Sequence, residues 1–216
     1  MHISLSNVSK KYSGNWIFKK LNFNFEAGRS FVILGSNGSG KSTLLQIISG
    51  ALSPSEGEIN YNFKDENKTH DKFGELYKYV SIAAPYMELI EEYTLKELIH
   101  FHREFKPFVK ELNTEDVITV IGLNDSNNKQ LKYFSSGMKQ RVRLALAILS
   151  DTPVLLLDEP CSNLDQKGVQ WYNELINKHA ANRVVIVCSN HQENEYKFCT
   201  GVLNINDFKP NVVQNN

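Results

Sequence analysis

The chain has 216 residues, of which 41% are hydrophobic and 22% are charged, and its 24 Lys and Arg balance 24 Asp and Glu. This length suits one domain with a sizeable core, and the zero net charge argues against nucleic-acid binding. No apolar run approaches the ~20 residues that span a bilayer, and none has the form of a signal peptide. Three cysteines without metal-ligand spacing favour a reducing, cytosolic compartment.

The first third of the chain predicts strands of two kinds. Ile3–Val8 and Leu21–Phe25 alternate apolar and polar residues, as half-buried antiparallel strands do, and Glu58–Phe63 is a candidate third strand. Phe31–Leu34 is instead a continuous apolar run, followed by a Gly-rich loop and a helical pattern over Ser42–Ser49. We therefore expect an antiparallel β subdomain next to a buried strand that leads into a helix.

The middle of the chain is predicted to be helical and separate from the sheet. Thr94–Phe105 has apolar residues at helical spacing behind a capping-box pattern, and Thr114–Ile121 repeats this pattern with Thr114 in the capping position. The polar stretch 64–78 is expected to be a solvated loop or an insertion. We thus expect one domain over 1–216, in which about 1–85 and 150–216 form the core and β subdomain and 86–150 forms a helical subdomain.

Two later apolar runs each end in polar residues that can do chemistry. Val154–Leu157 leads into Asp158 and Glu159, and Val184–Cys188 leads into a polar triplet that ends in His191. Such runs are typical of strands buried on both faces, and ligands of parallel sheets bind at the carboxyl ends of the strands. We therefore predict an α/β fold with a mostly parallel sheet and a ligand site at this edge.

The strongest motif is a phosphate-binding loop of the form G-x-x-x-x-G-K-[ST], placed between a strand and a helix. Its residues are Gly35, Ser36, Asn37, Gly38, Ser39, Gly40, Lys41, Ser42 and Thr43. Glycines let backbone amides close around phosphate oxygens, and the helix N-terminus favours the negative charge. Lys41 is expected to reach the β- and γ-phosphates and Ser42 to bind Mg²⁺. The alternative, a chance Gly/Ser-rich turn, is disfavoured by the strand–loop–helix context.

The acidic pair after the second buried run is predicted to take part in hydrolysis. Asp158 is placed to hold Mg²⁺, often through water, and Glu159 to act as the general base for the attacking water. The alternative is a strand end with two solvated acids, which the phosphate loop in the same chain disfavours.

A third segment resembles the signature motif of the ATP-binding cassette (ABC) ATPases, L-S-G-G-Q, and lies 23 residues before Asp158. Its five positions here are Phe134, Ser135, Ser136, Gly137 and Met138. The serine and the second glycine match the family pattern and the other three positions depart from it, while Gln140 and Arg141 match the Q-R that usually follows.

Three further positions extend the resemblance over the whole chain. Asp165 closes a segment that matches the family's D-loop, S-x-L-D, and His191 matches its switch histidine. Tyr12 lies where the family has an aromatic residue that stacks on adenine. The resemblance implies a P-loop NTPase (RecA-like) core with an antiparallel β subdomain and a helical subdomain.

The resemblance also implies an ATPase activity, ATP and Mg²⁺ as cofactors, and a head-to-tail dimer with a second copy or a paralogous ABC subunit. ATP would be bound by Tyr12 and the phosphate loop, and Lys41, Glu159 and His191 would be catalytic. The signature residues and Asp165 would act in trans, on the ATP held by the other subunit.

The leading function is the ATPase subunit of a multi-subunit ABC transporter, peripheral on the cytoplasmic face of the inner membrane. Transmembrane permease subunits on separate chains would contact the loop Pro85–Thr94 and the helix after it. Apolar residues of this loop, Tyr86, Met87, Leu89 and Ile90, either make that contact or pack in the core. The alternative is a non-transport ABC ATPase, an assembly or regulatory module of the iron–sulfur assembly or cell-division kind. A small-molecule kinase is disfavoured by the full set of motifs.

One position departs from the family pattern. The family has a Gln at the end of a core strand, which contacts Mg²⁺ or the attacking water, but Pro85 aligns there and no Gln occurs anywhere in 47–129. Proline offers neither a side-chain ligand nor an N–H group. A water in this place, Glu88 or the Tyr86 hydroxyl are the alternatives that the sequence leaves open.

Overall fold

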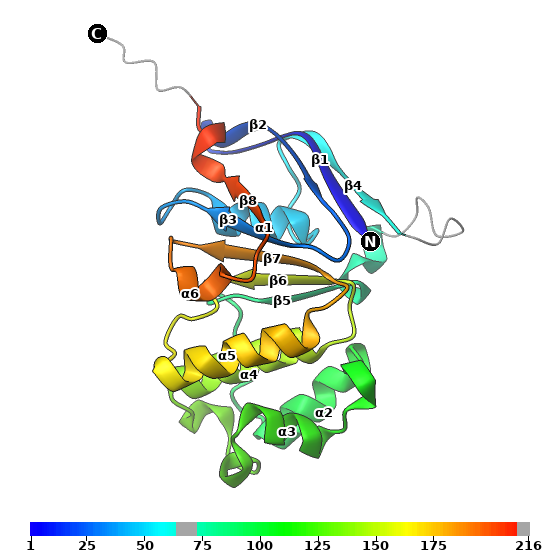
Figure 1. Cartoon of the computed structure of the whole chain (residues 1–216), viewed down its shortest axis with the longest axis vertical. Coiled ribbons are helices and arrows are strands. Elements are labelled where there is room, and N and C mark those ends of the chain that lie inside the picture. Colours follow the sequence, from blue (N-terminus) through cyan, green and yellow to red (C-terminus); the bar gives the residue numbers. More distant parts are fainter. Residues whose placement is uncertain (64–72, 211–216) are drawn as a thin grey trace.

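The computed structural model describes residues 1–63 and 73–210, which form two β-sheets with helices on both sides of the larger one (Figure 1). The smaller sheet is antiparallel, with strand order β2-β1-β4. Its strands are β1 (His2–Tyr12), β2 (Asn15–Phe25) and β4 (Glu56–Asn62). The predicted antiparallel strands near the N-terminus are thus confirmed, and the candidate third strand joins them.

The larger sheet is parallel in all its described pairs and has the order β5-β6-β7-β3-β8. Its strands are β3 (Ser30–Leu34), β5 (Val80–Ala83), β6 (Val154–Asp158), β7 (Val184–Ser189) and β8 (Gly201–Asn204). Because β6, β7 and β3 are consecutive and parallel, the polar segments that follow them meet at one edge of the sheet. The prediction of an α/β fold with a mostly parallel sheet is confirmed.

The helices flank this sheet. Those of the described residues are α1 (Lys41–Ile48), α2 (Leu95–Phe105), α3 (Thr114–Ile121), α4 (Ser136–Leu149), α5 (Gln166–His179) and α6 (Glu193–Tyr196). Helix α1 lies between the two sheets, whereas α4 and α5 lie on the opposite side of the larger sheet, with α2 and α3 beyond them (Figure 1). Within these ranges, no helix combines the length and hydrophobicity needed to cross a bilayer.

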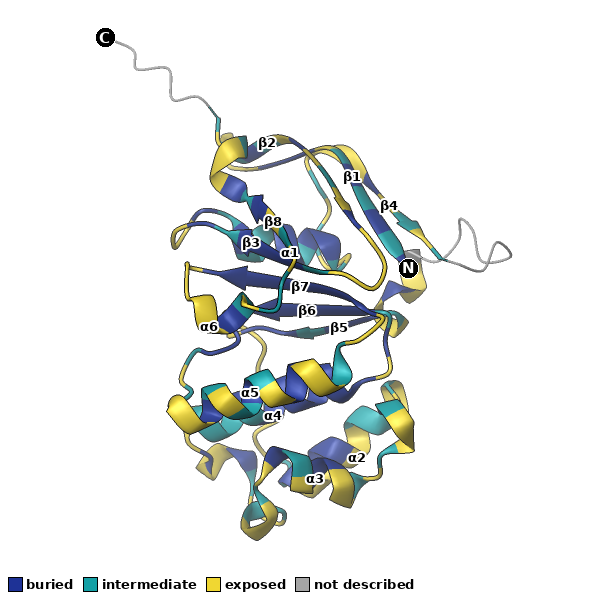
Figure 2. Cartoon of the chain, in the orientation of Figure 1, coloured by how far each residue is buried: buried dark blue, intermediate teal, exposed yellow. Residues whose placement is uncertain are grey.

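The parallel sheet separates two hydrophobic cores. In β6, Leu155 and Leu157 pack with helices α2 to α5, whereas Val154 and Leu156 pack with α1 and the antiparallel sheet. Strands β6 and β7 are buried at every position (Figure 2), which is why their sequences are continuous apolar runs. The sequence analysis expected the region 86–150 to be separate from the sheet. Helix α4 of this region instead packs directly on β5 and β6.

Two local expectations are refined by the structure. Thr94 and Glu97 form the predicted capping box of α2, but α3 is capped by Asn113 with Asp116 and not by Thr114. Asn113 lies one residue earlier, and its side-chain Oδ1 accepts the Asp116 N–H at 3.0 Å. Of the polar stretch 64–78, residues 64–72 lie outside the described part, and Phe73–Lys78 forms a short 3₁₀ helix.

Candidate nucleotide-binding site

The phosphate loop connects β3 to α1 and requires glycine at two positions. Gly40, the N-cap of α1, has a φ of 106°, and a Cβ there would lie 2.5 Å from Cγ2 of Ile17. A Cβ on Gly35 would lie 2.5 Å from Oγ of Ser39. The loop is therefore closely wound, with no room for side chains at these two places.

Lys41 is buried inside this loop. Its Nζ donates hydrogen bonds to the carbonyl oxygens of Gly35, at 2.9 Å, and Ser36, at 3.1 Å. Above it lies a cavity of about 370 Å³, lined by Ile17, the residues Asn37–Thr43 and Glu159. The ammonium group is thus held at the floor of a cavity whose walls are backbone amides and hydroxyls, an arrangement that suits phosphate oxygens.

Asp158 ends β6 beneath the start of α1 and is only 2% exposed. Burial raises the pKa of its carboxyl group, while a hydrogen bond with the Ser42 side chain opposes the rise. Its Oδ1 is buried without a hydrogen-bond partner in the described residues, and such an atom is costly unless something binds it.

The donor set at Asp158 fits Mg²⁺. This ion is commonly held by one or two protein oxygens, with water and substrate phosphates as the other ligands. Asp158 and Ser42 supply two such oxygens next to the phosphate cavity. Over 1–63 and 73–210, no group of three His, Cys, Asp or Glu side chains is placed to hold a metal ion.

Glu159 and His191 follow neighbouring strands at the same edge of the sheet. Glu159 lines the cavity, has a left-handed φ of 45°, and donates its backbone N–H to the carbonyl oxygen of Cys188 at 3.0 Å. His191 is exposed in the loop after β7, also with a left-handed φ, of 59°. The structure thus brings Glu159 into the cavity and leaves His191 at the surface, outside the cavity lining.

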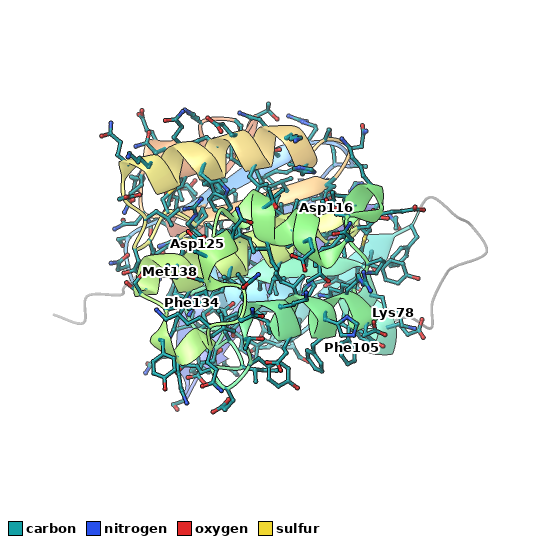
Figure 3. The ribbon with its side chains drawn as sticks, turned by 90° about the horizontal axis from the view of Figure 1, so that it is seen from below. Lys78, Phe105, Asp116, Asp125, Phe134 and Met138 are labelled. Carbon is teal, nitrogen blue, oxygen red and sulfur yellow. The ribbon has the colours of Figure 1, made fainter. Side chains whose placement is uncertain are left out.

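The signature residues lie at the start of α4, next to the D-loop. Ser135 caps this helix by accepting the Met138 N–H at 3.2 Å, and Asp165 caps α5 by accepting the Gly168 N–H at 2.7 Å. A Cβ on Gly137 would lie 2.9 Å from the carbonyl oxygen of Asn163. None of these residues lines the cavity of about 370 Å³. Seen from below, Met138 lies on the opposite side of the molecule from Phe105, at the end of α2 (Figure 3).

The aromatic residue expected to contact adenine is not among the lining residues. Tyr12 ends β1 and is 46% exposed, with the Lys10 ammonium 5.1 Å from its ring centroid. Ile17, on the next strand, lines the cavity instead, and the sequence analysis missed it. No motif marks Ile17, because its role comes only from the antiparallel hairpin that carries it to Gly40.

Comparison with known proteins identifies the family. The family model described as ABC transporter matches residues 18–162, more than half of the chain. The chain belongs to the ABC transporter family. It is 30% identical over 205 residues to the uncharacterised ABC transporter ATP-binding protein YybJ of Bacillus subtilis, a match that covers 94% of this chain and 92% of YybJ.

A second relative and a solved structure agree with this membership. The putative hemin import ATP-binding protein HrtA of Staphylococcus epidermidis is 30% identical over 224 residues, covering 97% of this chain and 98% of HrtA. A dimeric bacterial ABC transporter cassette is 26% identical with a TM-score of 0.77, covering 94% of this chain and 93% of the cassette chain. The P-loop NTPase fold of this ABC domain is thereby confirmed, and its family is that of ATP-binding ATPases.

Tyr86 and Glu88, the two side chains considered in place of the missing Gln, lie on different sides of the larger sheet. Burial raises the pKa of Tyr86 to about 12, with Asp158 adding to the rise and the Gln46 side chain of α1 opposing it. Glu88 instead lines two pockets shared with Arg143, on the α4 side of the sheet. Of the two, the tyrosine is the one that lies beside Asp158, and Gln46 is a neighbour that the sequence analysis did not single out.

The contact between the signature and the D-loop makes a prediction for the Gly137→Ala variant. A methyl group there must displace the Asn163 carbonyl, while alanine in place of glycine stabilises a helix by up to about 1 kcal/mol. We therefore expect ATP turnover to fall several-fold with the melting temperature nearly unchanged, measured by phosphate release and thermal unfolding. Gly74→Ala is the matched control, because a Cβ there meets nothing within 4 Å. Equal turnover in both variants would contradict the prediction.

Proposed function

We propose that this chain is the ATP-binding and ATP-hydrolysing subunit of a multi-subunit ABC transporter, and that two ATP molecules are sandwiched in a head-to-tail dimer with a second copy or a paralogous subunit. The observation that carries this is the buried, unpaired Asp158 oxygen beside Ser42 and the phosphate loop, with Glu159 lining the same cavity. Family membership and the relatives' names support the transporter setting.

The roles proposed for the phosphate loop and the acidic pair follow from their geometry. The loop amides and Lys41 would bind and orient the phosphates, Ser42 and Asp158 would hold Mg²⁺, and Glu159 would take a proton from the attacking water. When bound, Mg²⁺ supplies charge neutralisation at the β- and γ-phosphate oxygens. His191 and Tyr12 do not line the cavity, and it is the resemblance to the family that assigns His191 to the γ-phosphate side and Tyr12 to the adenine.

The trans role of the signature is supported by where it lies. Ser135 to Met138 and Asp165 are outside the cavity formed by the phosphate loop of their own chain. The N-terminus of the α4 helix, capped by Ser135, is partly exposed and would favour the negative charge of an ATP held by the partner. A head-to-tail dimer is the arrangement that lets these residues meet a phosphate.

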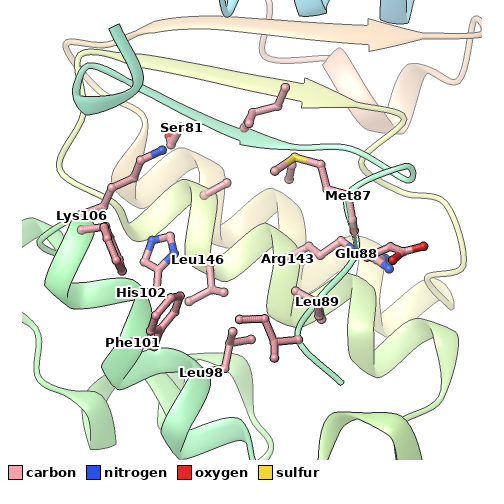
Figure 4. Close-up of a pocket in the computed structure, with 15 residues that line it drawn as sticks. Ser81, Met87, Glu88, Leu89, Leu98, Phe101, His102, Lys106, Arg143 and Leu146 are labelled. Carbon is pink, nitrogen blue, oxygen red and sulfur yellow. Dashed lines mark hydrogen bonds between the residues drawn. The ribbon is translucent and has the colours of Figure 1, made fainter. Parts of the chain in front are cut away.

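A second cavity, of about 280 Å³, supports docking on membrane subunits (Figure 4). It lies between β5, α2 and α4, and its lining is mostly apolar, with Leu98, Phe101 and Leu146 among the side chains labelled in Figure 4. Burial lowers the pKa of His102 to about 4, so this side chain is neutral at pH 7. An amphipathic helix of a permease subunit suits such a surface, because it offers an apolar face.

The rim of this cavity is suited to the same contact. Phe101 and Phe105 of α2 are 39% and 59% exposed, and Met87 and Ile90 of the loop after Pro85 are exposed as well. These side chains are therefore available to a partner and are not packed in the core, and Leu89 is half-buried. The proposed location, peripheral on the cytoplasmic face of the inner membrane, follows from docking of this rim on permease chains.

The docking proposal predicts the outcome of co-purification. We expect the chain to co-purify, from detergent-solubilised membranes, with a polytopic membrane protein encoded beside it. The double variant Phe101→Ser/Phe105→Ser should lose most of this recovery, because it removes the exposed apolar rim. Val202→Ser, at an exposed apolar residue on β8, is the matched control and should be recovered like the wild type. Recovery of the wild type only with soluble proteins would instead favour the assembly or regulatory ATPase.

A further inference from the structure

Glu195 is a buried carboxylate that the proposed hydrolysis does not use. It lies on the short helix α6, at the edge of the sheet where β6 and β7 end (Figure 1), and is 1% exposed. Its Oε1 accepts the backbone N–H of Cys161 at 3.2 Å, and its Oε2 accepts the Ser189 hydroxyl at 2.5 Å. One side chain therefore joins the segment that follows Glu159 to the segment that precedes His191.

The peptide bond between Pro160 and Cys161 is held from both sides. Its N–H group donates a hydrogen bond to Oε1 of Glu195, and its carbonyl oxygen accepts a hydrogen bond from Nε2 of Gln140 at 2.9 Å. Gln140 is 2% exposed and belongs to α4, the helix that begins with the signature residues. Buried polar side chains are costly without partners, so these two contacts hold the peptide in one place.

The backbone on either side of this arrangement is strained. Glu159, Asn163 and His191 all have left-handed φ angles, of 45°, 61° and 59°. Such conformations are unfavourable for residues other than glycine and persist only where the surroundings impose them. The hydrogen bonds of Glu195 supply such a constraint for both catalytic loops, because they tie the loops to each other.

We propose that Glu195 is a positioning residue, which together with Gln140 fixes the Pro160–Cys161 peptide and so sets Glu159 and His191 for ATP hydrolysis. Glu195 touches no part of the phosphate cavity, so its effect acts through these two residues. The inference rests on the proposed ATPase function and adds a link from the signature helix to the general base. A change at the start of α4 would reach Glu159 through Gln140 and this one peptide.

The test compares Glu195→Ala with the isosteric Glu195→Gln in the full-length chain. Glutamine keeps an acceptor for the Cys161 N–H, and its amide can donate to the Ser189 hydroxyl. We expect kcat for ATP hydrolysis to fall at least 10-fold in Glu195→Ala and to stay within 3-fold of the wild type in Glu195→Gln. The dissociation constant for ATP should change less than 3-fold in both. Glu193→Ala, on the exposed side of the same helix, is the control and should match the wild type.

A second pair of variants keeps the test decisive where Glu195→Ala fails to fold. Gln140→Leu and Ser189→Ala each remove one end of the same arrangement, so each should lower kcat without a matching loss of ATP binding. Combined with Glu195→Ala, Gln140→Leu should cause less loss than the product of the two single effects, since both act on one peptide.

Three results would overturn the inference. The first is a wild-type kcat in Glu195→Ala, or in both Gln140→Leu and Ser189→Ala. The second is an equal loss of kcat in Glu195→Gln and Glu195→Ala. The third is a loss of ATP affinity large enough to account for the loss of turnover. Failure of the proposed function is distinguishable, because the wild type would then show no ATP hydrolysis in the same assay.

Discussion

Replacing Glu159 by glutamine is expected to reduce ATP turnover by about 10²–10⁴-fold, the range over which a general base contributes to rate. Glutamine has nearly the same shape but cannot take a proton from water. Because Glu159 lines the phosphate cavity without being part of the loop that binds phosphate, ATP affinity should change little. The variant should therefore accumulate with ATP bound, and the ATP-held dimer should become visible by size exclusion with light scattering.

The control for this prediction is Glu174→Gln, the same exchange at an exposed position of α5. It should keep the wild-type rate and should not shift the elution volume with ATP. If Glu159→Gln hydrolyses ATP at the wild-type rate, Glu159 is not the base, and another group at this edge of the sheet must activate the water.

The second large effect is expected at the phosphate loop itself. In Lys41→Met, the side chain stays unbranched and nearly as long but loses its charge and all three donors. Each hydrogen bond to a charged group contributes about 1.5–3 kcal/mol, so the loss of two phosphate contacts should weaken ATP binding by roughly 10²-fold or more. Titration calorimetry with ATP measures this directly.

Stability should also fall in Lys41→Met, but by a smaller amount. The carbonyl oxygen of Gly35 loses the donor that holds it in the free protein, and an unpaired buried acceptor costs about 1–3 kcal/mol, whereas the Ser36 carbonyl still accepts the Ser39 N–H at 3.1 Å. Lys129→Met, at an exposed site, is the control for the loss of one positive charge. ATP affinity within 3-fold of the wild type in Lys41→Met would show that the backbone amides alone bind the phosphates.

Several elements were predictable because their signals are local. The phosphate loop is one contiguous segment, and its glycines and lysine have fixed places relative to a strand end and a helix start. The buried strands β6 and β7 are recognisable as continuous apolar runs, since both of their faces are covered. The capping box of α2 spans only Thr94 to Glu97.

Other features depended on residues that the sequence places far apart. Ile17 lines the cavity only because a hairpin brings it to Gly40, and Tyr86 lies beside Asp158 only because β5 and β6 are neighbours. Helix α4 was expected to be separate from the sheet, yet its apolar residues extend around it and are buried against β5 and β6.

The sequence by itself determined the chemistry of this ABC domain: a phosphate loop, an acidic pair at a strand end and a parallel sheet that gathers them. These follow from short motifs and apolar periodicity, which act within a few residues. The tertiary structure alone decided which groups support that chemistry, namely the Asn163 carbonyl against Gly137 and the Pro160–Cys161 peptide between Gln140 and Glu195. Such contacts depend on how helices pack on the sheet, and no local pattern of residues encodes that packing.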